Sequence, residues 1–453
     1  MDALQCNKKM RLEDHAVESD EEQNDEKRLS ILELNDDCLL IIFSYLNIWQ
    51  LMTAEDACER FKFVAEIAYR TRRMLQLRCH TSFQHPHDHE KVILADVQDI
   101  VKRLNPRMHS LTVYGCKFAS PIETLLSILG KCSNLRKLYL VRFSLRKADC
   151  LDNLFRAFGN VKVADFKDCG LTDNILEVCL RQATQLESLR VSLNASIQGY
   201  WLTELKNIKS IDLSHCRIIT ECFLIQFLQN NEGLKSLSIN GSNFASSARY
   251  YRYHQAISRY STSLETLKIT IWANTEKDAF TLIASLPRLK HLMIDIRADF
   301  DVDLLMEKLG KRNVLESLHI HCFRDIGPVP DVQNLLSFSK LKSLQFRCFS
   351  YPRYCDLVQL GAIKTLEELS LEYCIAVTNE GLVELINNCQ TLKLLNIIGC
   401  SRITNDFIPG ILPSMHNRTT FLQIVVVNNQ SIYNFNNPKF PKLKVTCKYK
   451  RYW

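Results

Sequence analysis

The spacing of apolar residues changes twice along the 453-residue chain. Residues 1–28 have almost no periodic apolar positions, whereas residues 30–63 have apolar residues at helical spacing. From residue 108 onward, an apolar residue recurs at a first position and again three and five positions later. A pattern with a fixed period predicts an array of similar units rather than several unrelated domains.

Thirteen frames carry this pattern, at a mean interval of about 26 residues. Because 46% of the residues are apolar, a random position satisfies all three requirements with a probability of about 0.1. Thirteen matches in near-regular order therefore indicate a repeat, and a weaker fourteenth frame begins at Phe440. The thirteen frames begin at Met108, Leu135, Val161, Leu186, Ile208, Leu234, Leu264, Leu289, Leu315, Leu341, Leu366, Leu392 and Phe421.

Each frame predicts a short strand followed by a helix. Counting the first residue as offset 0, the side chains at offsets 3 and 5 point to the same side of a strand, so we expect them in the core. The segment Thr378–Cys389 then has apolar residues at helical spacing and predicts a returning helix. No unit can bury its own apolar face, so the units are expected to stack into a curved solenoid.

Offset 8 is Cys or Asn in seven of the thirteen frames, far above the frequency of these residues in the chain. The seven residues are Cys116, Cys169, Asn194, Cys216, Cys374, Cys400 and Asn429. Such a side chain is expected to turn inward where the strand ends and to bind backbone groups there. The middle frames are irregular, with Trp272 and Arg297 at offset 8, and they predict an enlarged loop around Ala245–Arg259.

The clearest frames, LEELSLEYC (366–374) and LKLLNIIGC (392–400), resemble the leucine-rich repeat L-x-x-L-x-L-x-x-N/C. The predominance of cysteine resembles the cysteine-containing subclass of these repeats. The resemblance implies an α/β leucine-rich-repeat solenoid, a horseshoe with parallel strands on its concave side and helices on its convex side.

The segment at 30–63 predicts three helices. Asn35 suits the N-cap of the first helix, and the two aspartates that follow it suit the positive first turn. A second helix is expected after Trp49, and a third from about Glu59 into the arginine cluster at 70–73.

This segment resembles the F-box, whose pattern is roughly L-P-x-E-x-L-x-x-I-F-x-x-L-x-x-x-D-L followed by V-C-x-x-W. Three positions depart from it, because Asn35 replaces the proline, Gln50 the aspartate and Ala57 the valine. Asn35 is expected to preserve the helix start by capping it. The matching positions hold Leu34, Asp37, Leu39, Ile42, Phe43, Leu46, Leu51, Cys58 and Phe61.

An F-box followed by repeats resembles the F-box leucine-rich-repeat proteins, over Leu29 to about Ile432. The resemblance implies a non-catalytic substrate receptor of an SCF-type cullin–RING ubiquitin ligase. Its F-box would bind the Skp-family adaptor, and through it the cullin and the RING subunit, while the repeats capture an unknown protein substrate for ubiquitination and proteasomal degradation. The residues implied for adaptor binding are Leu34, Asn35, Leu39, Ile42, Phe43, Leu46, Leu51, Cys58 and Phe61.

Offsets 4 and 6 of each frame lie between the buried positions and are expected to face the concave side. Their charges are of both signs, which suits a protein partner better than a polyanion. We expect a polar ridge in the later repeats around His319, His321 and Arg347 to contribute to target binding. The candidate substrate-binding residues are Arg190, Lys268, Asp295, His319, His321, Arg347 and Glu372.

These patterns divide the chain into five segments. They are an acidic disordered tail (1–28), the F-box (29–72), a helical linker and N-terminal cap (73–107), about thirteen leucine-rich repeats (108–432), and a basic C-terminal segment or last repeat or cap (433–453).

Composition narrows the function classes. The wholly apolar runs are far shorter than the ~20 residues that span a bilayer, so no membrane association is expected. Residues 1–14 show no signal-peptide pattern, so the protein is predicted to lie in the cytoplasm, the nucleus or both. The eighteen cysteines include no C-x-x-C pair, and the cluster from Cys79 to His89 lacks paired metal-ligand spacing, so neither a metal nor a cofactor is predicted.

Two other functions are alternatives to that of a ligase receptor. A leucine-rich-repeat interaction scaffold without ligase function would use the same concave surface. A nucleic-acid-binding protein would need a concentrated basic face, whereas residues 29–453 are only mildly basic, so no nucleic acid is predicted as a partner. Motifs for a P-loop, a nucleophile elbow or a metalloprotease are absent from the sequence, which favours a protein that is not an enzyme.

Overall fold

The computed structural model divides the chain into two compact units, Met1–Ala68 and Tyr69–Trp453. The division falls within helix α3 (Glu59–Thr71). The predicted acidic tail lies outside the described residues. The described residues are 30–78, 108–115, 129–130, 132–143, 145, 152–216, 219–242, 250–271, 278–297, 302–322, 331–347, 352–427 and 432–448.

The first unit contains three α-helices, as the sequence predicts, and a short 3-10 helix before them. Asn35 caps α1, because its Oδ1 accepts a hydrogen bond of 2.8 Å from the backbone N–H of Cys38. Asn47 and Gln50 form a capping box at α2, each side chain accepting a 2.9 Å bond from the other's backbone N–H. These elements are η1 (Ile31–Glu33), α1 (Asp36–Tyr45), α2 (Ile48–Glu55) and α3 (Glu59–Thr71).

The core of this unit is built from one face of each helix. Leu39 and Leu51 are fully buried, and Phe43 is 2% exposed. The ring of Phe61 meets the ring of Phe43 edge to face, with centroids 5.3 Å apart. Arg60 of α3 ties the start of α1 to the bundle, because Nε and Nη2 donate to the carboxylate of Asp36 at 2.9 and 2.8 Å.

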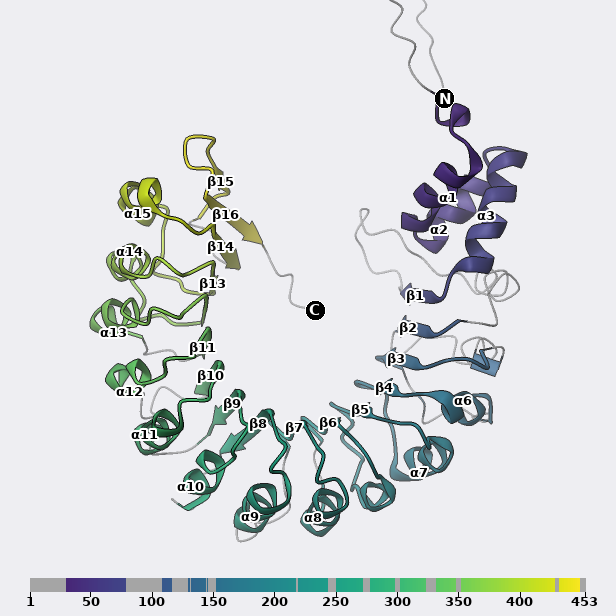
Figure 1. Cartoon of the computed structure of the whole chain (residues 1–453), viewed down its shortest axis with the longest axis horizontal. Helices are drawn as coiled ribbons and strands as arrows, with labels where there is room; N and C mark the ends of the chain where they lie inside the picture. The colour runs from purple at the N-terminus through teal and green to yellow at the C-terminus, as the bar shows by residue number, and fades with distance from the viewer. Residues whose placement is uncertain are drawn as a thin grey trace, which may run out of the picture. The chain divides into compact units, whose positions relative to one another are not determined.

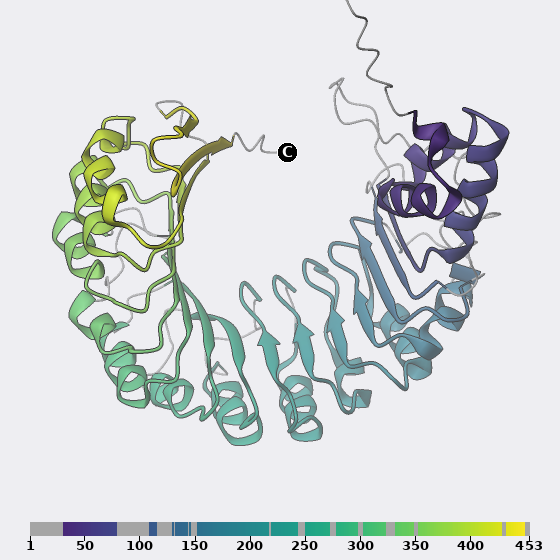
Figure 2. The same ribbon diagram turned by 45° about the horizontal axis from the view of Figure 1, so that its top comes forward.

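The second unit is one long sheet, sixteen-stranded over the described residues, with the strands in chain order except at the last hairpin. Neighbouring strands are parallel apart from the antiparallel pair β15–β16. Within this unit the strands line the inner side of an arc and the helices its outer side (Figure 1), and Figure 2 shows the strands side by side on the inner surface. This arrangement is a leucine-rich-repeat solenoid.

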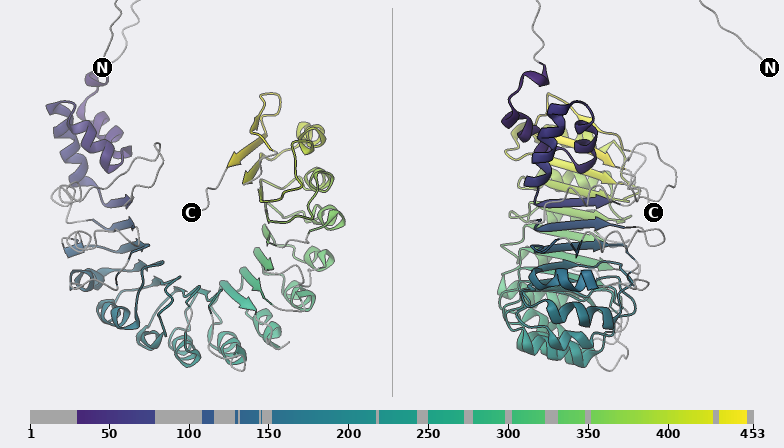
Figure 3. Two further views of the ribbon diagram at one scale, coloured as in Figure 1. Left: turned by 180° about the vertical axis from the view of Figure 1, so that it is seen from behind. Right: turned by 90° about the vertical axis from the view of Figure 1, so that its right-hand side faces the viewer.

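Each strand lies beside the next along the repeat sheet (Figure 3). Their bounds are β1 (Met74–Arg78), β2 (Ser110–Tyr114), β3 (Lys137–Val141), β4 (Val163–Asp165), β5 (Ser188–Arg190), β6 (Ser210–Asp212), β7 (Ser236–Ser238), β8 (Thr266–Ile271), β9 (His291–Ile296), β10 (Ser317–Cys322), β11 (Ser343–Arg347), β12 (Glu368–Glu372), β13 (Leu394–Ile398), β14 (Leu422–Val427), β15 (Phe435–Asn436) and β16 (Leu443–Lys448).

Helices return the chain between most of the described strands. They are α6 (Asp152–Ala157), η3 (Phe158–Asn160), α7 (Asp173–Gln182), η4 (Tyr200–Glu204), α8 (Glu221–Asn230), α9 (Tyr250–Tyr260), α10 (Asp278–Ala284), α11 (Val302–Arg312), α12 (Val332–Leu336), α13 (Tyr354–Leu360), α14 (Asn379–Asn388) and α15 (Phe407–Asn417).

The predicted register is confirmed from β2 to β14. At each step the residue at offset 3 pairs with the residue at offset 3 of the next frame, as in Leu344 with Leu369 and Leu369 with Leu395. The side chains at offsets 3 and 5 are buried in all thirteen frames. The last frame differs at its first position, where Phe421 is 48% exposed and Leu422 is buried instead.

Both ends of the repeat sheet differ from the prediction. Residues 74–78, predicted as part of a helical linker, form β1, whose Leu75 and Leu77 pair with the second strand. The pattern missed this frame because its first position is the polar Arg72. At the other end, Ile424 pairs with Val445, two residues out of the register predicted for the fourteenth frame.

The predicted loop around Ala245–Arg259 is wrong where the structure describes it. Residues 250–260 form α9, whose Tyr253, Ala256 and Ile257 are buried at helical spacing. Residues 243–249 lie outside the described residues. The long interval in this frame therefore contains an ordinary returning helix.

Five of the seven cysteines and asparagines predicted at offset 8 bind backbone groups at the strand end, whereas Cys116 and Asn429 lie outside the described residues. Each of the five donates to the carbonyl oxygen at offset 5 of the frame before it: Cys169 Sγ lies 3.1 Å from Leu140 O, and Cys216 Sγ 3.2 Å from Val191 O. The equivalent bonds of Cys374 and Cys400 are both 3.7 Å long. Ser242 makes the same contact at 2.7 Å, although the sequence pattern counted only cysteine and asparagine.

Asn194 makes the most complete set of these contacts. Its Nδ2 donates to the carbonyls of Phe166 at 2.7 Å and Val191 at 2.8 Å. Its Oδ1 accepts 3.0 Å bonds from the backbone N–H groups of Cys169 and Leu171. One fully buried amide therefore joins the turns of two adjacent repeats.

The residue before offset 8 turns the chain in most described repeats. Offset 7 has a positive φ, which brings the next side chain inward. In the frames that begin at Leu264, Leu289 and Leu315, offset 7 instead stays in the strand and is buried. The residues at offset 7 with positive φ are Arg142, Asp168, Leu193, His215, Gly241, Tyr373 and Gly399.

Replacing Asn194 with alanine is expected to lower the free energy of unfolding by about 2–4 kcal/mol, because buried backbone groups of two repeats lose their partner. Urea unfolding followed by circular dichroism measures the change. Asn230→Ala is the matched control, since Asn230 is exposed and donates one bond to Thr203 O. Equal effects of the two substitutions would contradict this role of Asn194.

The offset-8 cysteines are expected to be unreactive in the folded protein. Burial raises the pKa of Cys169 and Cys216 to about 12, so the reactive thiolate is scarce near neutral pH. Iodoacetamide labelling read by mass spectrometry should modify the exposed Cys222 and Cys355 at least tenfold faster. Equal labelling rates in the native state would show that the turns are open.

Candidate protein-binding surfaces

The first unit exposes an apolar face on α1. Ile41 is 60% exposed and Tyr45 85%, and Ile42 lies beside them at helical spacing with 36% exposure. Adjacent exposed apolar side chains on one helix are typical of a protein-binding surface, unlike apolar residues scattered singly. We call Ile41, Ile42 and Tyr45 the α1 face.

Other exposed apolar side chains of the same unit come from the neighbouring elements. Ile31 and Leu32 of η1 are 45% and 53% exposed, and Phe63 of α3 is 56% exposed. Arg60 holds η1 in place, because its Nη1 donates to Leu32 O at 2.6 Å. The unit therefore presents apolar side chains from three of its elements to solvent.

The predicted adaptor-binding residues fall into three groups. Leu39, Phe43 and Leu51 are core residues, so the prediction that Leu39 and Phe43 line an interface is wrong for these side chains. Ile42 is exposed, and Asn35 is exposed while its side chain caps α1. The remaining residues are partly exposed, namely Leu34, Leu46, Cys58 and Phe61.

Sequence reasoning missed Ile41, Tyr45 and Phe63. The signal that could have found the first two lies in the spacing of α1, where Leu39 and Phe43 already form one inward-facing stripe. The apolar residues left over on the opposite side of the helix are those that a partner can reach.

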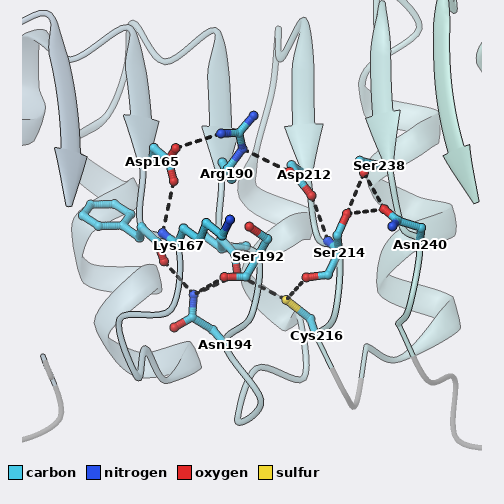
Figure 4. A network of polar contacts seen from close by, with 12 residues as sticks. Asp165, Lys167, Arg190, Ser192, Asn194, Asp212, Ser214, Cys216, Ser238 and Asn240 are labelled. Carbon is cyan, nitrogen blue, oxygen red and sulfur yellow. Dashed lines mark hydrogen bonds and ion pairs between the residues drawn. The ribbon is translucent and has the colours of Figure 1, made fainter. Parts of the chain in front are cut away.

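The concave face of the second unit carries two polar rows. Row 4 contains the offset-4 residues Asp165, Arg190, Asp212, Ser238, Lys268 and Met293, and row 6 contains the offset-6 residues Lys167, Ser192, Ser214, Asn240, Thr270, Asp295 and His321. Most of the polar residues of row 6 are buried. The rows are held together by the network in Figure 4.

Arg190 bridges two carboxylates in row 4. Its Nη1 lies 3.0 Å from Asp165 Oδ2 and its Nε 3.0 Å from Asp212 Oδ2, as Figure 4 shows. Burial raises the pKa of Asp165 above its ordinary value, although the nearby Arg190 guanidinium acts in the opposite direction. The cation therefore opposes the effect of burial and favours the charged form of this largely buried carboxylate.

Farther along the concave face, hydroxyl and amide groups connect row 4 with row 6. Ser214 Oγ and Ser238 Oγ both donate to Asn240 Oδ1, at 2.6 and 3.0 Å. Asn240 Nδ2 donates to Asp295 Oδ2 at 3.4 Å. Side chains of three repeats are therefore joined by hydrogen bonds, and Figure 4 shows those of Ser214, Ser238 and Asn240.

A second polar cluster crosses β9 to β12. Asp295 Oδ1 lies 3.1 Å from His321 Nδ1, and both residues are buried. His321 Nε2 lies 3.3 Å from Gln345 Nε2, and Gln345 donates to Glu372 Oε1 at 2.7 Å. The guanidinium of Arg347 lies 4.0 Å from Glu372.

The structure thus brings Asp295, His321, Arg347 and Glu372 together, as the predicted ridge requires. Asp295 and His321, however, are only 2% and 8% exposed, so they support the surface rather than form it. Burial also lowers the pKa of His319 to about 4, with the neighbouring His321, Lys268 and His291 acting in the same direction. Of the predicted target-binding residues, Arg190, Lys268 and Arg347 are the exposed ones.

A hollow of about 280 Å³ lies on the concave face and draws on both rows. We call it the central hollow. Most of its residues stand at offsets 4 and 6 of consecutive frames, so the repeat register was the signal that could have found them. It is lined by Lys167, Ser192, Leu193, Asp212, Ser214, His215, Ser238, Asn240, Lys268 and Met293.

The described part of the chain lacks features of a metal site or a membrane span. It contains no group of three or more histidine, cysteine, aspartate or glutamate residues placed to hold a metal ion. The cluster from Cys79 to His89 lies outside the described residues. No helix among the described residues is both long and apolar enough to span a membrane.

Comparison with known proteins gives distant similarities. No protein-family model matches the chain. The chain is 24% identical over 380 residues to BTB/POZ domain-containing protein FBL11 of Arabidopsis thaliana, a match that covers 81% of this chain and 34% of the relative. The chain therefore spans about a third of that relative's length. A crystal structure of an internalin (inlF) from Listeria monocytogenes is similar with a TM-score of 0.39 and 15% identity, over 89% of this chain and 94% of the internalin.

Replacing Arg190 with alanine is expected to destabilise the protein by about 1–2 kcal/mol at pH 7, because two carboxylates lose their cation. Without Arg190 the pKa of Asp165 rises further. The loss of stability caused by the substitution is therefore largest above that pKa, and it disappears as the pH falls and the carboxyl becomes protonated. The difference from the wild type should therefore be smaller at pH 4.

Urea unfolding at pH 7 and pH 4 measures this difference. Arg181→Ala is the control, because Arg181 forms an exposed pair with Glu177 within one helix. A loss of stability for Arg190→Ala that is the same at both pH values would show that the charge of Asp165 is not what Arg190 stabilises.

Proposed function

We propose that this protein is the substrate-recognition subunit of an SCF-type cullin–RING ubiquitin ligase. The observation that carries the proposal is the α1 face, an exposed apolar surface on a compact helical unit that buries other apolar residues in its own core. A helical unit of this size that keeps apolar side chains in water is suited to binding another protein. In this proposal the partner is a Skp-family adaptor, which links the chain to the cullin and the RING subunit.

The repeat unit is proposed to capture the protein substrate. Its concave face offers a long polar surface with charges of both signs, including the exposed Arg190, Lys268 and Arg347. Charged groups arranged this way give specificity for a complementary protein surface. The chain itself is proposed to be non-catalytic, acting by raising the local concentration of substrate lysines near the transferring enzyme.

Ile41→Glu and Tyr45→Glu are each expected to reduce co-purification of the adaptor at least tenfold, because they place a charge in the apolar interface. The measurement is affinity purification from cells with quantitative mass spectrometry of the adaptor and the cullin. Thr53→Glu is the matched control, since it adds the same charge to an exposed position of α2. Adaptor binding that survives both α1 substitutions would refute the proposed interface.

Leu39→Asp separates folding from binding in the same experiment. Leu39 is fully buried, so this substitution is expected to unfold the first unit and to lose adaptor binding together with its helical circular dichroism signal. The α1 substitutions should lose binding while the signal is kept. A wild-type protein that co-purifies neither adaptor nor cullin would favour the alternative, an interaction scaffold without ligase function.

A further inference from the structure

Charged side chains follow the edge of the repeat sheet at which the strands begin. They stand at offset 1 of successive frames, and we call them row 1. The backbone fixes their alignment, because each carbonyl oxygen of the row accepts a hydrogen bond from the N–H of the next member, as His109 O does from Arg136 at 2.9 Å. Neighbouring members therefore lie one strand spacing (~4.8 Å) apart. Row 1 consists of Arg73, His109, Arg136, Lys162, Glu187, Lys209, Lys235, Glu265, Lys290, Glu316, Lys342, Glu367 and Lys393.

From Lys235 onward the charges of row 1 alternate in sign. Each lysine of this stretch pairs with a glutamate of a neighbouring repeat, at distances from 2.7 Å for Lys393 to 3.9 Å for Lys235. Glu265 lies between two of these lysines, and its pKa is held below the ordinary value by the hydrogen bond and charge of Lys290. The alternating stretch is therefore largely neutralised within the protein.

The first four members of row 1 include no acid. Arg73 and Arg136 are exposed and form no ion pair with the described residues, and the same is true of Lys137, at offset 2 beside Arg136. These residues belong to four consecutive strands, β1 to β4, so their charges add on one edge of the sheet. We call this surface the basic edge. Its members are Arg73, His109, Arg136, Lys137 and Lys162.

Glu187 ends the basic edge. Its carboxylate lies 3.8 Å from Lys162 and 2.7 Å from Lys209. The hydrogen bond and charge of Lys209 hold the pKa of Glu187 below its ordinary value, and Lys162 acts in the same direction. The uninterrupted positive charge from Arg73 to Lys162 thus spans three strand spacings, or about 14 Å.

We infer that the basic edge binds a short acidic segment of another protein, a run of consecutive Asp and Glu residues. An extended chain advances ~3.3 Å per residue, so about five residues cover the 14 Å of the edge. The guanidinium groups of Arg73 and Arg136, two strands apart, can each bind one carboxylate through two parallel hydrogen bonds. This surface lies outside the α1 face and rows 4 and 6, so the inference goes beyond the proposed function.

The length of the basic edge favours a short segment over a nucleic acid or a membrane surface. A polyanion that continues beyond Lys162 meets the negative charge of Glu187 and then the alternating stretch. Nucleic-acid binding without sequence preference also depends on the number of phosphates neutralised, and this edge offers cations for only a few. An acidic run can end where the positive charge ends.

The test is fluorescence anisotropy of the purified full-length protein with a labelled decapeptide that has five central glutamates between Gly-Ser flanks. A matching peptide has five glutamines. The glutamate peptide should bind at least tenfold more tightly, and added salt should weaken its binding. An oligouridylate of ten nucleotides and vesicles of equimolar phosphatidylcholine and phosphatidylserine should each compete less well than the unlabelled glutamate peptide at equal total charge.

Paired double variants locate the binding on row 1. Arg73→Gln with Arg136→Gln should reduce the affinity for the glutamate peptide at least tenfold, because the two exposed cations of the edge are lost. Lys290→Gln with Lys393→Gln is the matched control. It removes the same charge from the same row, but in the alternating stretch, and should leave the affinity unchanged.

Two further measurements use the boundary of the edge. Glu187→Gln should tighten binding about threefold, because it removes the carboxylate that Lys162 and Lys209 now share. Carbodiimide cross-linking joins carboxylates of the bound peptide to lysine amines, and mass spectrometry should find these links at Lys137 and Lys162.

Several outcomes overturn the inference. They are equal affinity of the glutamate and glutamine peptides, equal loss in the two double variants, or cross-links confined to lysines outside the basic edge. Stronger competition by the oligouridylate or by the vesicles also overturns it, because the edge would then be a surface for another class of polyanion. None of these outcomes bears on the proposed function, which co-purification of the adaptor tests separately.

Discussion

The hydrogen bond from the six described cysteine, asparagine and serine side chains at offset 8 to the preceding repeat is the interaction on which the stacking of those repeats depends. Backbone pairing aligns two strands, but it leaves the chain to turn away at the strand end with buried polar groups in the turn. A thiol, amide or hydroxyl that reaches the offset-5 carbonyl satisfies those groups and fixes the turn at the same time. Because the bond runs between repeats, an error in one turn is transmitted to its neighbour.

The register of the sheet was predictable because it depends on side-chain alternation, which a sequence displays directly. Leu344, Leu369 and Leu395 stand opposite one another for the same reason that their frames align. The first strand was missed because Arg72 occupies a position that is apolar in the other frames. Ser242 was missed because its contact needs only a short donor, a property that a cysteine or asparagine pattern does not capture.

The candidate surfaces were less predictable, because exposure depends on which of two apolar stripes a helix buries. Leu39 and Ile42 differ by three positions, yet one is fully buried and the other lies on the surface. On the concave face, Asp295 and His321 stand at an offset that the sequence assigns to the solvent side of the sheet, yet they pair with each other and are buried. Strand periodicity assigns a side chain to a face, whereas its partners decide whether another protein can reach it.

The lengths of the strands distribute stiffness unevenly along the repeat unit. Strands β4 to β7 are three residues long, whereas β8 to β10 have six because buried Ile271, Ile296 and Cys322 continue them. A longer strand contributes more inter-strand hydrogen bonds and resists shear, so β8 to β10 act as a rigid plate. The shorter strands bear most of the elastic deformation under load. The central hollow lies across that boundary, so one of its walls is compliant and the other stiff, and a change in curvature alters its width.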